Sequence, residues 1–392
     1  MAERKKISLL TTIFWIFLVL FVSINIAIQV SGNTYIYKAL FYNFADIDDL
    51  DIFPTRIVKN GDPQPWTDAL DYNKAKIPDS VRAELEKLNT VAYLIIKNDS
   101  VKYEEYWDRY GPRSLSNSFS MAKSVIGILI GIAHDEGKIK SLDAPLCTYL
   151  PDYCDEVAKR VTIRHLLTMC SGSTWDESYS NLFSMTTKAY YGNDLEELML
   201  KEVKMKSEPG KYYNYKSGDT QILAFILEKA TGKTVSDYAS EKLWSRVGAE
   251  LPAQWSLDHA DGHEKAYCCI YSDARDFARI GKLMLDSGNW NGEQVVSKEY
   301  VRLALAPNGL VYSDDTTSKV MTYGYLWWLM NYNGHDIFYM RGLSGQYVFV
   351  IPDEKMIVVH LGKKREKIQH HRRPDEVDYI IQGALSMYGV RK

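Results

Sequence analysis

Ser120 and Lys123 are the residues of this sequence whose types and spacing most clearly suggest chemistry. They form the only Ser-x-x-Lys in the chain, and an almost unbroken apolar run from Val125 to Ala133 follows them. That run is too short to span a bilayer, so it predicts a helix buried inside a globular domain. Residues three apart share one face of a helix, and we therefore expect the Lys123 amine beside the Ser120 hydroxyl.

The chemistry that this pair suggests is nucleophilic catalysis. A serine hydroxyl is a poor nucleophile at neutral pH and needs a neighbouring base, and a desolvated lysine can lose its proton and serve as that base. The N-terminus of the following helix would add free N–H groups and the positive end of its dipole. The alternative is a chance Ser-x-x-Lys with Lys123 on the surface. A lysine at the start of an apolar run is costly to bury, however, unless it has a function.

Length, composition and charge are those of an ordinary globular protein. The 392 residues can form one large domain or two moderate ones, with 46% hydrophobic and 25% charged residues. A net charge of −3 gives no electrostatic reason to expect nucleic-acid binding. The sequence contains no His-Glu-x-x-His, Cys-x-x-Cys, Gly-x-Gly-x-x-Gly or Gly-x-Ser-x-Gly motif. We therefore expect no metal and no cofactor, and an α/β-hydrolase is disfavoured.

Two smaller features leave alternatives open. The five cysteines, at positions 147, 154, 170, 268 and 269, define no disulfide framework. A Cys147–Cys154 bridge is one reading for an oxidising compartment, and small buried thiols are the other. The adjacent His370 and His371 are candidate metal ligands, although their basic surroundings suit a solvated loop.

Residues 1–32 differ in character from the rest of the chain. A basic stretch at residues 4–6 precedes 24 uncharged residues, from Ile7 to Val30. As a helix these would span roughly 36 Å, more than the roughly 30 Å hydrocarbon core of a bilayer. They predict an N-terminal transmembrane anchor, with a cleaved signal peptide as the alternative. The basic flank is expected in the cytoplasm, so the remainder would lie on the periplasmic or extracellular side.

The rest of the sequence suggests an α/β (α+β) domain preceded by a short arm. Residues 33–75 are rich in aromatic and acidic residues, which suits a stalk or arm, and residues 76–392 follow as the main domain. Strand patterns occur at 90–96, 101–107, 336–340, 347–351 and 356–361, and helical patterns at 161–168, 219–230, 273–285 and 375–387. Strands near both ends predict an antiparallel sheet flanked by helices, with a helical insert at about 138–255.

Three motifs in this order resemble the serine β-lactamase and penicillin-binding superfamily. After Ser120-x-x-Lys123, Tyr215-Lys216-Ser217 resembles the Tyr-x-Asn/Ser motif, and Leu343-Ser344-Gly345 stands where the family has Lys-Thr-Gly or His-x-Gly on a strand. The phrase His165–Gly172 also resembles a family hallmark. The resemblance covers about residues 80–390. It is closest to the class C-like branch, which includes family VIII carboxylesterases and 6-aminohexanoate-dimer hydrolases.

The resemblance implies roles for these residues. Ser120 would form an acyl-enzyme, Lys123 and Tyr215 would share general base and acid duty, and the backbone N–H groups of Ser120 and Gln346 would form an oxyanion hole. Ser217 is either a substrate contact or the N-cap of the following helix, or both. The resemblance and the composition nominate further residues for substrate binding: Leu343, Ser344, Gly345, Trp175 and Arg341. Tyr179, Trp327 and Trp328 are candidate pocket walls, with core packing as the alternative for most of the aromatic residues.

One departure from the family pattern bears on the substrate. The β-lactamases and transpeptidases of the family have a basic residue where this chain has Leu343, and that cation helps to hold the substrate carboxylate. Its absence favours a small ester or amide as substrate, unless Arg341 supplies the charge. Two alternatives remain: a penicillin-binding, β-lactamase or D-Ala-D-Ala carboxypeptidase activity, and a catalytically inactive relative that acts as a binding protein.

Overall fold

Strand segments from both ends of the chain build one seven-stranded sheet, in the order β12-β13-β14-β15-β3-β4-β2. The computed structural model describes residues 2–368 and 372–390. Its strands are β1 (Thr55–Val58), β2 (Thr67–Asp68), β3 (Thr90–Lys97), β4 (Ser100–Tyr106), β5 (Ser116–Asn117), β6 (Tyr212–Tyr213), β7 (Ala253–Ser256), β8 (Ile270–Ser272), β9 (Asn289–Trp290), β10 (Glu293–Gln294), β11 (Val311–Tyr312), β12 (Trp328–Tyr332), β13 (His335–Gly342), β14 (Gln346–Ile351) and β15 (Met356–Gly362). Neighbouring strands of the large sheet are antiparallel except β2 and β4. The predicted sheet, closed by distant parts of the chain, is confirmed.

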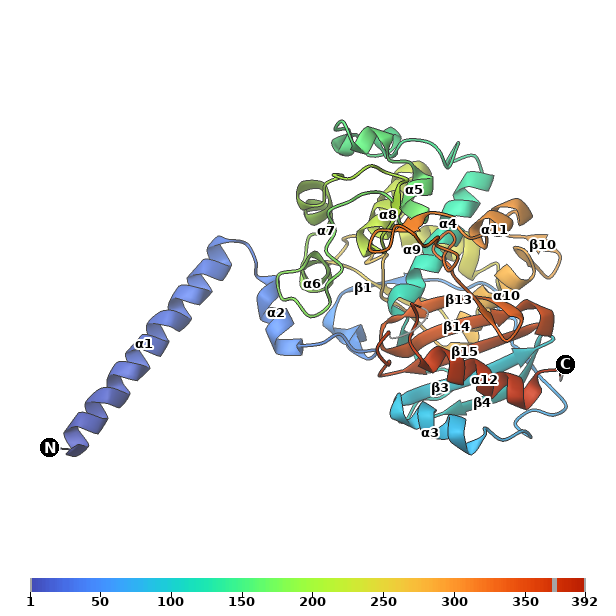
Figure 1. The fold of residues 1–392 in the computed structure, drawn as a ribbon, viewed down its shortest axis with the longest axis horizontal. Coiled ribbons are helices and arrows are strands. Elements are labelled where there is room, and N and C mark those ends of the chain that lie inside the picture. Colours follow the sequence, from blue (N-terminus) through green and yellow to red (C-terminus); the bar gives the residue numbers. More distant parts are fainter. Residues whose placement is uncertain (1, 369–371, 391–392) are drawn as a thin grey trace.

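Helices cover both faces of this sheet (Figure 1). The α-helices of the described chain are α1 (Ala2–Val30), α2 (Tyr35–Tyr42), α3 (Asp79–Lys87), α4 (Ala122–Asp135), α5 (Ile163–Leu167), α6 (Met185–Tyr191), α7 (Leu195–Glu197), α8 (Ser217–Thr231), α9 (Val235–Ala239), α10 (Ala274–Leu285), α11 (Lys298–Ala304) and α12 (Glu376–Tyr388). On one face, Val81 of α3 and Ile380 of α12 belong to the same core as Phe349. On the other face, Gly281 brings α10 so close that a Cβ atom there would lie 3.0 Å from Val348.

The predicted helices are present, with corrections at their ends. Helix α8 begins at Ser217 with Lys216 as its N-cap, so the expectation that Ser217 caps this helix was wrong. Ser120 lies not on an α-helix but in a 3₁₀ turn, Phe119–Met121, which leads into α4. The sequence patterns missed edge strand β12. They also missed a second sheet, of order β1-β7-β8-β5, whose strands are four residues long or shorter. His370 and His371 lie outside the described residues.

Residues 33–75, expected as a stalk or arm, lie along the domain. Strand β1 pairs with β7, and β2 pairs with β4 at the edge of the large sheet. Ile47, Phe53 and Val58 of this segment are buried in the main hydrophobic core. The segment therefore contributes strands and core residues to the domain that it precedes.

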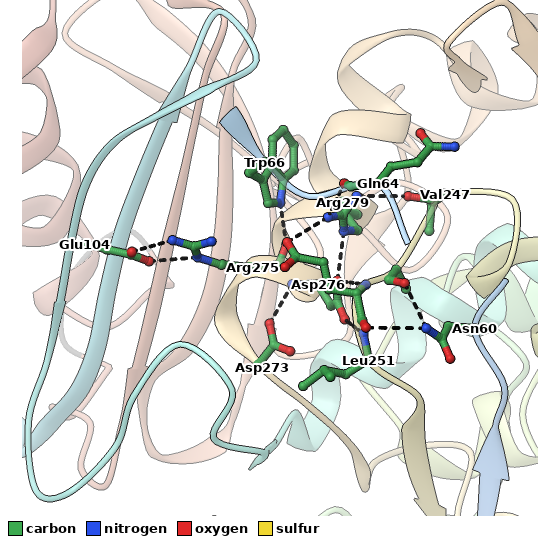
Figure 2. Close-up of polar contacts among 12 residues, drawn as sticks. Asn60, Gln64, Trp66, Glu104, Val247, Leu251, Asp273, Arg275, Asp276 and Arg279 are labelled. Atoms are coloured by element: carbon green, nitrogen blue, oxygen red, sulfur yellow. Dashed lines mark hydrogen bonds and ion pairs between the residues drawn. The ribbon is translucent and has the colours of Figure 1, made fainter. Parts of the chain in front are cut away.

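A polar network around Arg279 joins this segment to α10 (Figure 2). The buried guanidinium donates from Nε to Asp276 at 2.8 Å and from Nη2 to the carbonyl of Gln64 at 2.7 Å. The indole of Trp66 donates to the carbonyl of Arg275 at 3.0 Å. A guanidinium has five donors in a fixed plane, so Arg279 can bridge several backbone segments at once.

Helix α1 projects away from the domain (Figure 1). Its segment Leu9–Val30, 22 residues long, is long and apolar enough to cross a membrane, and none of it is buried by the rest of the protein. Its length and composition suit a membrane anchor or a signal sequence.

The cysteine bridge considered above, between Cys147 and Cys154, does not form in the structure. Cys147 and Cys154 are free thiols, and the exposure of Cys154 also departs from the buried-thiol alternative. Instead, the sequence neighbours Cys268 and Cys269 form a disulfide. No spacing argument could nominate this pair, because such arguments look for bridges that close a loop.

His360 on β15 buttresses the turn between β13 and β14. The imidazole is fully buried, and its Nδ1 lies 2.6 Å from the carbonyl oxygen of Gly345. Burial lowers the pKa of His360 to about 4, because a charged ring would be desolvated there.

This shift predicts an acid-sensitive stability. The imidazole titrates near pH 6.5 when unfolded and near 4 when folded, so the unfolded state binds more protons between these values. His360 therefore makes its full contribution to the free energy of unfolding above about pH 6.5. About 3 kcal/mol of that free energy is lost as the pH falls from there through about 4. Urea unfolding of the full chain in mild detergent should show this loss, and His360→Gln should show a smaller one. Equal pH slopes for the two proteins would contradict the assignment.

Candidate active site

Ser120 opens into a cavity of about 870 Å³ to which distant parts of the chain contribute. Ser217 at the start of α8, Tyr267 near the disulfide and Leu343 after β13 line it together with Ser120. Further walls come from residues 39–46 and from the loop and helix at 177–191. The volume falls in the range of small-molecule sites, roughly 300–1,000 Å³.

The turn that carries Ser120 is sharply bent. Phe119 has a left-handed φ of 43°, which is uncommon for a bulky side chain. The Phe119 N–H donates to the side chain of Asn117 at 2.9 Å, and the Ser118 N–H donates to the carbonyl of Ile270 at 2.9 Å. Strained backbone of this kind persists only where the surroundings fix it, and it is concentrated at functional sites.

The structure brings Lys123 to Ser120, as the spacing predicted. Lys123 is only 1% exposed, and its Nζ lies 2.9 Å from Ser120 Oγ. The same nitrogen donates to the carbonyl of Tyr267 at 2.8 Å. Among the described residues, no carboxylate lies within 4.0 Å of this amine, which instead meets a hydroxyl, a carbonyl and aromatic faces.

Tyr215 completes the group. Its ring centroid lies 5.1 Å from Lys123 Nζ, so the amine lies over the face of the Tyr215 ring. Trp328 and Tyr323 pack against the Tyr215 ring, at centroid distances of 5.5 and 6.2 Å. The three side chains predicted from the motifs therefore lie together, although 92 residues separate Lys123 from Tyr215 in sequence.

The family-like phrase at 165–172 has a structural explanation, because it holds the Tyr215 segment. The Met169 carbonyl accepts from the Asn214 N–H at 2.8 Å, and the Met169 sulfur lies 3.4 Å from the Lys216 N–H. The Gly210 N–H donates to the carbonyl of Cys170 at 2.9 Å. The backbone on both sides of Tyr215 is thus fixed to Met169.

Glu177, which the sequence analysis missed, is a polar centre of the cavity wall. The N–H and Oγ of Ser217 donate to it at 2.6 and 2.7 Å, and the Trp175 indole donates at 2.8 Å. The Tyr179 hydroxyl donates to the same carboxylate. A carboxylate at the first residue of α8 also suits the positive end of the helix dipole. No motif marks Glu177, because its role depends on contacts formed only in the folded chain.

These contacts separate the aromatic candidates. Tyr179 lines the cavity, as predicted, whereas Trp175 does not: it is 3% exposed and packs over Gly218. Its indole orients Glu177 instead. Trp327 is 1% exposed and packs on Phe338, which agrees with the core-packing alternative.

The third motif forms a turn rather than a strand. Leu343–Gly345 is a 3₁₀ turn between β13 and β14, and Leu343 and Ser344 line the cavity. Gly345 has a φ of 84°, and a Cβ there would lie 2.7 Å from the carbonyl of Lys364, so glycine is required.

Gln346 does not lie where the oxyanion prediction requires it. Its backbone pairs with Gly342 in the hairpin, and the residue is fully buried outside the cavity lining. Its side-chain Nε2 donates to the carbonyls of Leu343, Ser344 and Gly362, at 3.1, 3.1 and 2.6 Å. Gln346 therefore fastens the turn. Leu343, the first residue after β13, faces the cavity instead.

Arg341 is also displaced from its expected position. Its guanidinium carbon lies 4.0 Å from the ring centroid of Trp328, and the residue is not part of the cavity lining. Trp328 in turn packs on Tyr215. The Arg341 guanidinium thus packs on the aromatic rings next to Tyr215, and it does not supply a cation to the cavity in place of Leu343.

Two titratable groups with shifted pKa values follow Tyr215 in sequence, half-buried Lys216 and fully buried Asp219. Burial raises the pKa of Asp219 to about 7, although the hydroxyls of Ser171 and Ser173 donate to it at 2.6 and 3.2 Å. Burial lowers the pKa of Lys216, which donates to the Ser173 carbonyl. In the described part of the chain, no group of three or more His, Cys, Asp or Glu side chains could hold a metal ion.

Comparisons with known proteins agree with this architecture. The Beta-lactamase family model matches residues 79–380. The 6-aminohexanoate-dimer hydrolase of Paenarthrobacter ureafaciens is 25% identical over 331 residues, which cover 80% of this chain and 83% of that protein.

Solved structures show the same fold. A family VIII carboxylesterase has a TM-score of 0.61 at 15% identity, covering 83% of this chain and 99% of its own. The penicillin binding protein of Bacillus halodurans has a TM-score of 0.57 at 18% identity, covering 79% and 100%. The chain therefore belongs to the beta-lactamase family, and its sequence relatives include proteins named as a 6-aminohexanoate-dimer hydrolase and as putative D-alanyl-D-alanine carboxypeptidases.

Proposed function

We propose that this chain is a serine hydrolase that cleaves a small ester or amide through an acyl-enzyme on Ser120. The observation that carries the proposal is the 2.9 Å contact between Lys123 Nζ and Ser120 Oγ, at the wall of a cavity large enough for a small molecule. An amine within hydrogen-bond reach of a hydroxyl is the geometry that a base-activated nucleophile requires.

In the first half-reaction, Ser120 Oγ attacks the substrate carbonyl while its proton passes to Lys123. In the neutral amine, the N–H that Lys123 donates to the Tyr267 carbonyl leaves the lone pair of the nitrogen free to accept the Ser120 proton. When the tetrahedral intermediate collapses, the bond to the leaving group breaks and the Lys123–Tyr215 pair returns the proton to the departing oxygen or nitrogen. In the second half-reaction the same pair takes a proton from water, which attacks the carbonyl carbon of the acyl-enzyme. The bond from that carbon to Ser120 Oγ then breaks, the pair returns the proton to Ser120 Oγ, and the acid is released.

We assign the oxyanion hole to the backbone N–H groups of Ser120 and Leu343, in place of Ser120 and Gln346. Ser120 and Leu343 line one cavity, and the Cα of Gly342, just before Leu343, approaches the carbonyl of Ser118. Two convergent N–H donors would stabilise the negative charge that develops on the carbonyl oxygen.

The cavity favours a substrate without a carboxylate. Leu343 presents an apolar side chain to the cavity, and Lys363, a lysine of the cavity wall, is already paired with Asp108 at 2.8 Å and Asp48 at 3.1 Å. A free carboxylate entering this site would have to compete with both aspartates. These contacts support an uncharged ester or amide rather than a β-lactam or D-Ala-D-Ala peptide.

The proposal includes a location. Helix α1 is retained as a membrane anchor, and residues 76–392 form the hydrolase domain outside the cytoplasm, with about 138–255 as a helical insert. Residues 33–75 connect the two as an arm whose strands pair with those of the domain. The apolar span of α1 and the basic residues before it support this topology.

Hydrolysis of a p-nitrophenyl ester by matched variants tests the function. Ser120→Ala should lose at least about a thousandfold in kcat, because the nucleophile is gone. Tyr215→Phe should lose on the order of a hundredfold or more, because the acid–base hydroxyl is removed. Tyr213→Phe is the matched control, because its buried hydroxyl has no hydrogen-bond partner among the described residues, and its rate should not change.

Two outcomes would count against the proposal. Activity that survives Ser120→Ala, or an equal loss in the two tyrosine variants, would remove these residues from their roles. Covalent labelling by a fluorescent penicillin without any ester hydrolysis would favour the penicillin-binding alternative.

Replacing Leu343 separates its backbone from its side chain. Leu343→Pro removes the N–H, and it should lower kcat by roughly a hundredfold to a thousandfold. Leu343→Ala keeps the N–H and should retain most of kcat. If both variants have intact folds by circular dichroism and similar kcat values, the second N–H of the oxyanion hole does not come from Leu343.

A further inference from the structure

The segment that follows the membrane helix forms part of the active-site cavity. Ala39, Leu40, Phe44 and Ala45 line the same cavity as Ser120. They belong to α2 and to the residues just after it, and α2 lies against α6 near the end of α1 (Figure 1). An anchor and a catalytic cavity need share no residues, so this arrangement calls for an explanation.

Chain length keeps this cavity wall close to the membrane. The apolar span of α1 ends at Val30 and α2 begins at Tyr35, so the intervening backbone can extend at most roughly 18 Å. The Tyr37 hydroxyl also donates to the Asn25 side chain on α1 at 2.9 Å. With α1 in a bilayer, α2 must therefore lie at or near the headgroup region.

The side chains around this wall are apolar yet exposed. Leu40 is 65% exposed, Phe41 80% and Phe44 70%. The loop that contributes Tyr179 and Leu182 to the lining of the same cavity also carries Phe183, which is 71% exposed. A cluster of exposed apolar side chains marks a contact with a partner or a membrane, and aromatic residues are enriched at the bilayer interface.

We propose that the cavity admits the hydrocarbon chain of a membrane-dissolved ester or amide, which enters from the bilayer past Leu40 and Phe44. This inference rests on the proposed function and names its substrate class. The exposed side chains continue from the bilayer side into the lining of the cavity that contains Ser120, so a chain that leaves the membrane stays in apolar contact. The reaction is the acyl transfer already described: the carbonyl carbon bonds to Ser120 Oγ and the alcohol or amine departs.

The test uses the full chain in phosphatidylcholine vesicles. Hydrolysis of p-nitrophenyl palmitate dissolved in the same vesicles is compared with hydrolysis of p-nitrophenyl butyrate in solution. Leu40→Asn/Phe44→Asn should lower the palmitate-to-butyrate ratio of kcat/KM at least tenfold, and the ratio cancels any loss of folded protein. Leu70→Asn, which alters a 99% exposed leucine outside the cavity lining, should leave the ratio unchanged.

Two results would overturn the inference. One is an unchanged ratio in the double variant. The other is equal palmitate turnover when the ester is supplied in separate, protein-free vesicles. That result would mean that the enzyme takes up the ester from the aqueous solution and not from its own bilayer. If butyrate hydrolysis requires Ser120 while either result holds, only the substrate class fails. If neither ester is hydrolysed in a Ser120-dependent way, the proposed function itself fails.

Discussion

A buried amine that has no carboxylate partner among the described residues is the constraint on which this site depends. Lys123 is almost completely removed from solvent, and its nitrogen contacts Ser120 Oγ, the carbonyl of Tyr267 and the face of Tyr215. Burying such a group is costly unless its hydrogen bonds are made. The surrounding structure must therefore keep all three partners in position, and they come from widely separated parts of the sequence.

The fold meets this constraint through short segments held by backbone hydrogen bonds. Met169 fixes the chain on both sides of Tyr215, while Gln346 and His360 fasten the turn after β13. Glu177 collects donors from the loop and from the start of α8. These residues do not have to react. In the proposed mechanism their role is to hold the reacting groups in one arrangement, which is what preorganisation requires.

Features marked by local sequence patterns could be predicted, whereas features that depend on contacts formed only in the folded chain could not. The Ser120–Lys123 contact follows from spacing along one short segment, and the central sheet follows from strand patterns. The placement of Gln346 and Arg341 was wrong because residues 343–345 form a turn between β13 and β14 rather than a strand, which changes the residues that face the cavity. Glu177 carries no local signal, and the Cys268–Cys269 disulfide joins neighbours that a search for loop-closing bridges ignores. The contribution of residues 39–46 to the cavity is a tertiary contact that no pattern in the sequence marks.

The central claim is that Ser120 becomes acylated during turnover, and trapping that species tests it most directly. The full chain would be mixed with a p-nitrophenyl ester, quenched in acid within the first turnovers, digested and mapped by mass spectrometry. The account predicts that the acyl mass is carried by Ser120 and that it disappears when excess enzyme is left to deacylate. Acyl mass on a different residue, or sustained turnover with Ser120 unmodified at every time point, would contradict it.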